Sequence, residues 1–75
     1  MPRRVAVELD AAGRPAAVTL ADATLRVETV CEMWRLDDEW WRHPIARRYA
    51  EVVLEGGKRV VLFEDLNARE WFLQR

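Results

Sequence analysis

The first part of the chain alternates hydrophobic with polar residues, and this alternation predicts two short strands. In Arg4–Leu9 every second residue is apolar, which is the period of a half-buried strand. Asp10–Pro15 then combines an acidic turn former, a glycine and a proline, so it predicts a turn. Ala16–Leu20 predicts a second strand, which we expect to pair with the first as a hairpin.

The segment Leu25–Leu36 fits two periods. As a strand it alternates apolar and polar residues, with interruptions at Val30 and Trp34. As a helix it would place four apolar residues on one face, namely Val27, Val30, Cys31 and Trp34. Its high content of β-branched residues and its weak N-cap favour the strand. A β-bulge near Val30 would restore the alternation.

The second half of the chain predicts a loop followed by a three-stranded meander. Asp37–Pro44 predicts the loop, because it contains an acidic triplet, a tryptophan pair and a proline. Gly56–Gly57 suits a two-residue primed hairpin turn, since both positions tolerate positive φ, and Asp65–Arg69 predicts the next turn. The three predicted strands are Ile45–Glu55, Arg59–Glu64 and Glu70–Gln74.

These elements predict a single small all-β domain over residues 1–75. We expect five to six short antiparallel strands in one twisted sheet or half-barrel, with the C-terminal three-stranded meander at one end. A domain of this size buries only roughly 60% of its unfolded surface, so large aromatic side chains matter for its stability. We therefore expect the tryptophans to form the core inside the half-barrel.

Composition and charge narrow the functional classes. The chain has 12 basic and 13 acidic residues, so it carries no general electrostatic footprint for nucleic acid or anionic lipid. Its uncharged apolar stretches are much shorter than the about 20 residues that span a bilayer, and the N-terminal segment lacks the apolar region of a signal peptide. Cys31 is the single cysteine, which fits a reducing compartment. We expect a cytoplasmic protein that has no contact with membranes.

Few residues are available for catalysis or metal binding. His43 is the only histidine, and we interpret Cys31 as a small core residue rather than a nucleophile beside it. The carboxylates of Asp37–Glu39 suit a hard cation, but they lack EF-hand spacing and are typical of a solvated face. Phosphate-binding glycine loops, nucleophile elbows and zinc-ligand spacings do not occur. The sequence thus predicts no enzyme, no cofactor and no metal site.

The aromatic residues allow two interpretations. Rings on a sheet face, with arginines nearby, can stack single-stranded bases and contact phosphates. Acidic residues on the neighbouring strands would cancel much of that charge, however, and a small domain needs its rings in the core. Trp40 and Trp41 are the exception, because adjacent residues of an extended chain face opposite ways. The candidate interaction surface has an aromatic anchor and a basic rim, namely Trp40, Trp41, Arg42, Arg47 and Arg48.

Five motifs give the chain a resemblance to a known family. They are Met33–Arg42 with its single and double tryptophan, Ile45–Tyr49, Val53–Gly57, Leu62–Leu66 and Trp71–Arg75. In these motifs the chain resembles a small bacterial domain of unknown function, which occurs alone and at the C-terminal end of the non-catalytic Y-family polymerase homologue of mutagenesis cassettes. The resemblance extends from Val7 to Arg75 and implies an association with error-prone, damage-induced DNA synthesis. It transfers no activity and no site residue.

The chain departs from the family pattern at four positions. It has Ala50 where a second aromatic residue is common, and Arg69 where glycine is common. It has Glu51 and Glu64 at two positions that are often basic. If the family contacts DNA through that face, the acidic replacements imply weak contact here.

The expected function is that of a non-catalytic protein-interaction module, accessory to bacterial DNA-damage tolerance by translesion synthesis. The resemblance implies a protein partner among DNA-repair polymerase components. Two alternatives stay open. One is a module that binds single-stranded nucleic acid weakly, and the other is a structural β domain that forms a homo-oligomer through an open sheet edge.

Overall fold

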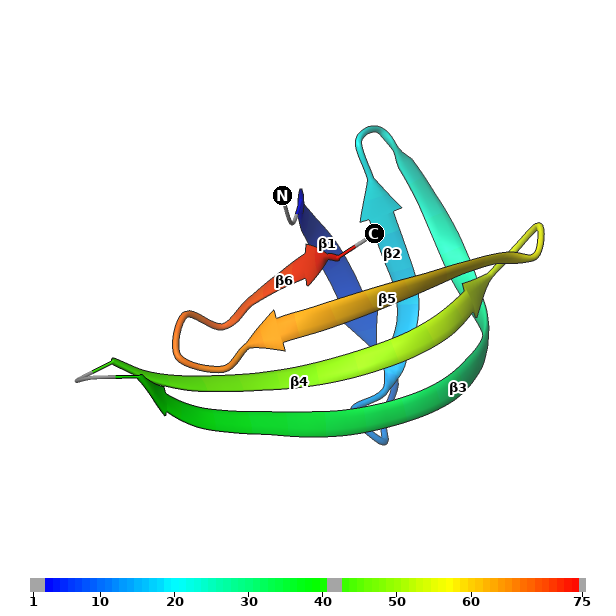
Figure 1. Ribbon diagram of the computed structural model, residues 1–75. Helices are drawn as coiled ribbons and strands as arrows, with labels where there is room; N and C mark the ends of the chain where they lie inside the picture. The colour runs from blue at the N-terminus through cyan, green and yellow to red at the C-terminus, as the bar shows by residue number, and fades with distance from the viewer. Residues whose placement is uncertain (1–2, 41–42, 75) are drawn as a thin grey trace.

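The computed structural model describes residues 3–40 and 43–74, which form a closed antiparallel β-barrel (Figure 1). Its strands are β1 (Arg3–Leu9), β2 (Pro15–Leu20), β3 (Ala23–Trp40), β4 (His43–Leu54), β5 (Lys58–Asp65) and β6 (Glu70–Leu73). Each strand pairs with the next one along the chain, and β6 pairs back with β1. The all-β prediction and the C-terminal meander are confirmed, and the β1–β6 pairing closes the sheet. The described ranges contain no helix that could span a membrane.

The long strand β3 confirms that Leu25–Leu36 is a strand. Its register with β4 shifts twice, between Val27 and Thr29 and between Val30 and Glu32, and the second shift is the bulge expected near Val30. The first residues of β3 pair with β2 and the rest pair with β4. A bulge bends a strand and increases its twist. The bent β3 can therefore pair with β2 at its start and with β4 along the rest of its length (Figure 1).

The prediction of a loop over Asp37–Pro44 is wrong for most of its length. Asp37–Trp40 complete β3, and His43–Pro44 begin β4 in register with them. The charged residues are tolerated because this end of the hairpin extends beyond the barrel core, where Asp37 and Asp38 are exposed. Pro44 is tolerated because it is close to the start of its strand.

The glycine turn between β4 and β5 is present, but it is longer than predicted. Leu54 pairs with Lys58, so the turn also includes Glu55. The Gly57 N–H donates to the Leu54 carbonyl at 2.9 Å. Gly56 has φ +92 and Gly57 has φ +88, so both positions need the left-handed conformation that glycine adopts without strain.

The barrel interior is filled mainly by aliphatic side chains on alternate positions of the strands. The buried cluster comprises Val18, Ala50, Val52, Leu54, Val60, Leu62 and Trp71. The expectation of a tryptophan core is confirmed for Trp71, which is buried in this cluster, and wrong for Trp34, which is 40% exposed. Since strand number sets barrel width, a barrel of six strands has room for valine and leucine but not for several indoles.

Cys31 also departs from its predicted place. It is a free thiol on the surface. Val30 and Glu32 have consecutive partners on β4, so Cys31 is the extra residue of the second bulge. Its interpretation as a core residue is therefore wrong.

Candidate interaction surface

Four aromatic residues form a row across four neighbouring strands. They are Trp34 on β3, Tyr49 on β4, Phe63 on β5 and Phe72 on β6, and we call them the aromatic ladder. Each is paired in register with the next. The ring centroids are 5.3 Å apart for Trp34–Tyr49, 5.3 Å for Tyr49–Phe63 and 5.1 Å for Phe63–Phe72.

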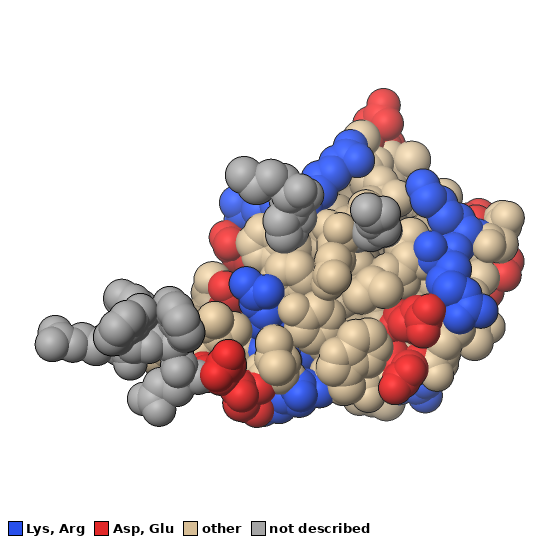
Figure 2. Space-filling model, viewed as in Figure 1, with Lys and Arg blue, Asp and Glu red and all other residues tan. Residues whose placement is uncertain are grey.

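The ladder lies on the outer face of the barrel. Leu62 and Trp71 point into the core, and successive residues of a strand point to opposite faces, so Phe63 and Phe72 point outward. Figure 2 shows uncharged side chains gathered over the middle of this face, with charged side chains around them. Phe63 is nevertheless only 3% exposed. The ladder is therefore a second apolar layer outside the barrel.

Arg47 covers the centre of the ladder. Its guanidinium carbon lies 4.6 Å from the centroid of the Phe63 ring. Its Nη1 donates a hydrogen bond to the Tyr49 hydroxyl at 3.3 Å. A guanidinium over an aromatic face contributes about 0.5–1 kcal/mol at partly exposed sites. The charge of Arg47 is thus engaged within the protein.

Two of the three neighbouring ring pairs in the ladder are stacked, and the third, Tyr49–Phe63, is tilted by 37°. The planes of Trp34 and Tyr49 differ by 3°, and at their separation parallel rings overlap with a lateral offset. Phe63 and Phe72 also stack, with planes 21° apart. Ring faces inside the ladder are therefore covered by neighbouring rings. A platform for bases needs open ring faces, and this arrangement instead presents ring edges.

Two arginines that border the ladder have acidic partners. Arg4 pairs with Glu70 at 2.9 Å, and Arg59 pairs with Glu51 at 3.2 Å. The hydrogen bond that the Arg59 side chain donates to Glu51 is the main cause that holds the pKa of Arg59 above its usual value. Binding to a phosphate backbone relies on basic groups that are free to neutralise phosphates. This face offers little such charge.

The β3 end of the ladder is its exposed end. Trp34 is 40% exposed and Leu36 is 42% exposed. They are two residues apart on one strand, so they share the outer face. Leu36 is also directly opposite Arg47 on β4. Trp34 and Leu36 together form an exposed apolar patch beside the better-buried part of the ladder.

The predicted site residues that the structure describes do not lie on one surface. Arg47 lies on the outer face, whereas Arg48 follows it on β4 and points to the other face, opposite Arg35. Trp40 ends β3 in register with His43. The side chain of Trp40 and the whole of Trp41 and Arg42 lie outside the described residues. The structure therefore does not bring Arg47 and Arg48 to one surface.

The acidic triplet does not form a metal site among the described side chains. Asp37 and Asp38 are consecutive strand residues and point to opposite faces. Asp37 accepts a hydrogen bond from Arg35 Nε at 2.9 Å. Across residues 3–40 and 43–74, no group of three or more His, Cys, Asp or Glu residues is placed to hold a metal.

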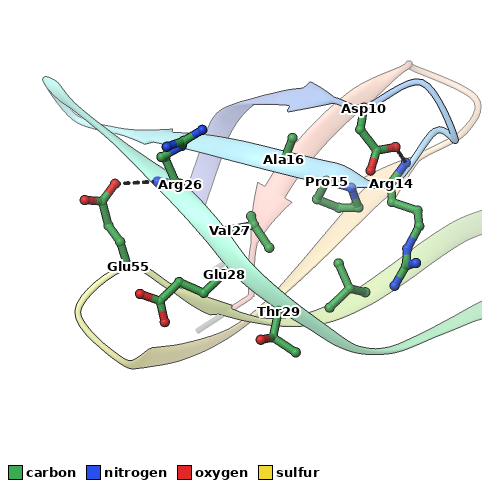
Figure 3. Close-up of a pocket in the computed structure, with 10 residues that line it drawn as sticks. Asp10, Arg14, Pro15, Ala16, Arg26, Val27, Glu28, Thr29 and Glu55 are labelled. Carbon is green, nitrogen blue, oxygen red and sulfur yellow. Dashed lines mark hydrogen bonds between the residues drawn. The ribbon is translucent and has the colours of Figure 1, made fainter.

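A cleft of about 600 Å³ opens where β3 leaves β2 (Figure 3). Two of its carboxylates hold the local backbone. Asp10 accepts hydrogen bonds from the N–H groups of Ala12 and Arg14, both at 2.9 Å. Glu55 accepts one from the N–H of Arg26 at 2.6 Å. The Asp10 contacts stabilise the turn between β1 and β2, and the Glu55 contact joins β3 to the turn after β4. These two carboxylates of the cleft wall therefore have a structural role.

Sequence reasoning missed Tyr49, Phe63 and Phe72 as members of a surface. A signal was present, because Leu62–Phe63 and Trp71–Phe72 are adjacent large apolar pairs. Two such neighbours point to opposite faces, so each pair indicates a sheet that is covered on both sides.

Comparisons of the chain with protein-family models, with curated proteins and with solved structures gave no match.

Proposed function

We propose that this chain is a non-catalytic protein-interaction module that binds its partner through the exposed end of the aromatic ladder. The observation that carries the proposal is the exposed apolar patch of Trp34 and Leu36, which continues into the buried rings. Tryptophan is among the residues most enriched at binding hot spots, where its truncation costs about 2 kcal/mol or more. The rigid ladder behind Trp34 supports it as an anchor.

A protein surface fits this face better than a single-stranded nucleic acid does. Ring edges and an aliphatic side chain complement the apolar side chains of a protein. The ion pairs around the ladder suit the polar rim that surrounds the apolar centre of a protein interface. Bases would find the inner ring faces already covered. Phosphates would meet Arg4 and Arg59 already paired with acidic residues, and Arg47 already packed against Phe63.

The resemblance to the polymerase-associated bacterial domain supplies the proposed setting. In that setting the module is accessory to translesion synthesis in DNA-damage tolerance. Its partners are proteins of the damage-induced polymerase assembly, and the non-catalytic Y-family homologue is the first candidate.

The test is a binding titration with the purified non-catalytic polymerase homologue and with the other polymerase proteins of such a cassette. Trp34→Ala should weaken binding by about 30-fold, which corresponds to a loss of about 2 kcal/mol. Leu9→Ala is the matched control, because Leu9 is 46% exposed but lies on β1, away from the ladder. The control should bind like the unmodified chain.

Two results of this titration would overturn the proposal. Binding that Trp34→Ala leaves unchanged would remove the ladder as the interface, and no binding to any of these proteins would remove the translesion setting. A labelled single-stranded oligonucleotide provides the second titration, at about 50 and about 200 mM salt. We expect no binding. Affinity that falls steeply with salt and is lost in Trp34→Ala would replace the protein partner with a nucleic acid.

A further inference from the structure

One edge of β3 has no strand partner over much of its length. β3 pairs with β2 only from Ala23 to Arg26, and beyond that point it pairs with β4 alone. After the second bulge, Glu32–Trp40 follows β4 in unbroken register. The other edge of Glu32–Trp40 therefore pairs with no strand of the described residues. Alternate N–H and C=O groups along such an edge point away from the sheet and can accept another strand.

Two residues of opposite charge on this edge flank Leu36. They are Arg35 and Asp37, and they lie on the same face of β3. Their side chains form an ion pair at 2.9 Å, with 60% and 61% of their side-chain surface exposed. If β3 pairs antiparallel with a copy of itself about Leu36, Arg35 of each copy lies opposite Asp37 of the other. The two-fold symmetry forms this favourable pair twice.

The exposed apolar residues follow the same symmetry on the outer face. In this register Leu36 lies directly opposite Leu36 of the second copy. Trp34 lies diagonally across from that leucine, which is within reach of an aromatic side chain. The patch of Trp34 and Leu36 on each copy thus joins into one apolar cluster. The two aromatic ladders then lie on the same face of one continuous sheet.

We propose that a second copy of this chain pairs with the free edge of β3, antiparallel and centred on Leu36, so that two barrels share one sheet. Charged residues on an edge usually prevent such pairing. Here the two charges that flank Leu36 have opposite signs, and in this register they lie opposite each other across the interface. A register centred on Trp34 would place Arg35 opposite Met33 and Asp37 opposite Cys31, which leaves both charges without an opposite charge across the interface.

This inference goes beyond the proposed function, because it adds main-chain pairing between two copies at the edge of β3 to the binding of another protein on the outer face. Edge pairing is in the plane of the sheet, so Trp34 and Leu36 of both copies stay on the outer face, where another protein can bind their joined patch. The residues tested below are Arg35 and Asp37, which are not part of the ladder. Failure of either proposal can therefore be recognised separately.

The first test is a charge swap, measured by sedimentation of the full chain from low micromolar to near millimolar concentration. Arg35→Asp and Asp37→Arg each place like charges opposite each other, and each should weaken dimerisation at least tenfold. The double variant R35D/D37R restores opposite charges and should restore the dimer. The swap R4E/E70R is the matched control, because it exchanges a surface ion pair of the same kind between β1 and β6. It should leave the dimer unchanged, and circular dichroism checks that every variant is folded.

The second test measures the register with a spin label on the exposed native thiol of Cys31. Pairing centred on Leu36 separates the two labels by ten strand residues, or about 33 Å at 3.3 Å per residue. Pairing centred on Trp34 would separate them by six residues, or about 20 Å. A chain that stays monomeric, single swaps that dimerise normally, or a distance near the shorter value would each overturn the proposal.

Discussion

The aromatic ladder is expected to stabilise the fold through contacts between rings, and this can be measured at its centre. Phe63 is 3% exposed, stacks on Phe72, contacts the tilted ring of Tyr49 and lies under the guanidinium of Arg47. Phe63→Leu keeps an apolar side chain at the position but removes the ring. Phe72→Leu does the same at the end of the ladder, where one ring contact is lost.

The expected cost follows from these contacts. An aromatic pair contributes about 0.5–1.5 kcal/mol beyond the burial of its surface, and the cation–π contact adds about 0.5–1 kcal/mol. Phe63→Leu should therefore lower the free energy of unfolding by about 1.5–4 kcal/mol, and Phe72→Leu by about 0.5–1.5 kcal/mol. The total stability of a domain of this size is roughly 4–11 kcal/mol, so both losses are measurable.

The assay is urea unfolding followed by far-ultraviolet circular dichroism, for each single variant and for the double variant. The coupling free energy between Phe63 and Phe72 should be about 0.5–1.5 kcal/mol. Trp34→Leu combined with Phe72→Leu is the control cycle. These two rings occupy opposite ends of the ladder, so their effects should add to within about 0.5 kcal/mol. A Phe63–Phe72 coupling no larger than that of the control would refute the stacking argument.

Three further predictions concern the turns, the core and the thiol. Gly57→Ala should destabilise by about 1–2 kcal/mol in chemical denaturation, because φ is +88, whereas Arg69→Gly should be neutral or stabilising, because Arg69 already has φ 58. Leu54→Ala should cost about 2–5 kcal/mol, since Leu54 is fully buried, but Leu36→Ala should change monomer stability by less than about 0.5 kcal/mol. Cys31 should react with a thiol reagent in native buffer as fast as in urea, and slow reaction in the native state would contradict its exposure.

The local elements could be predicted from the sequence because their signals are local. The alternation in Arg4–Leu9 and the adjacent glycines after Glu55 each determine a strand or a turn within a few residues. Closure of the barrel depends on Arg3 pairing with Leu73, at the other end of the described chain, and no local pattern reports such a contact. The strand at Asp37–Trp40 was missed because a hairpin beyond the core needs no apolar face.

The position of Trp34 could not be predicted without the number of bulges. Each bulge adds one residue and reverses the faces of all later residues in the strand. The sequence suggested one bulge, near Val30, and a single bulge turns Trp34 toward the core. The structure has two, with Glu28 and Cys31 as the extra residues, and together they return Trp34 to the outer face. One bulge more than expected therefore places Trp34 on the outer face and not in the core.

The two bulges also explain why the ladder and the free edge occur together. Pairing of β3 with β2 ends at Arg26, and the first bulge lies between Val27 and Thr29. The bend at this bulge directs β3 along β4 and away from β2. The second restores the face on which Trp34 meets Tyr49. A narrow barrel cannot hold these rings inside, and the bent strand gives them an outer face to stack on. The same bend leaves the edge of β3 open beside the most exposed ring, which is where we expect protein contacts to concentrate.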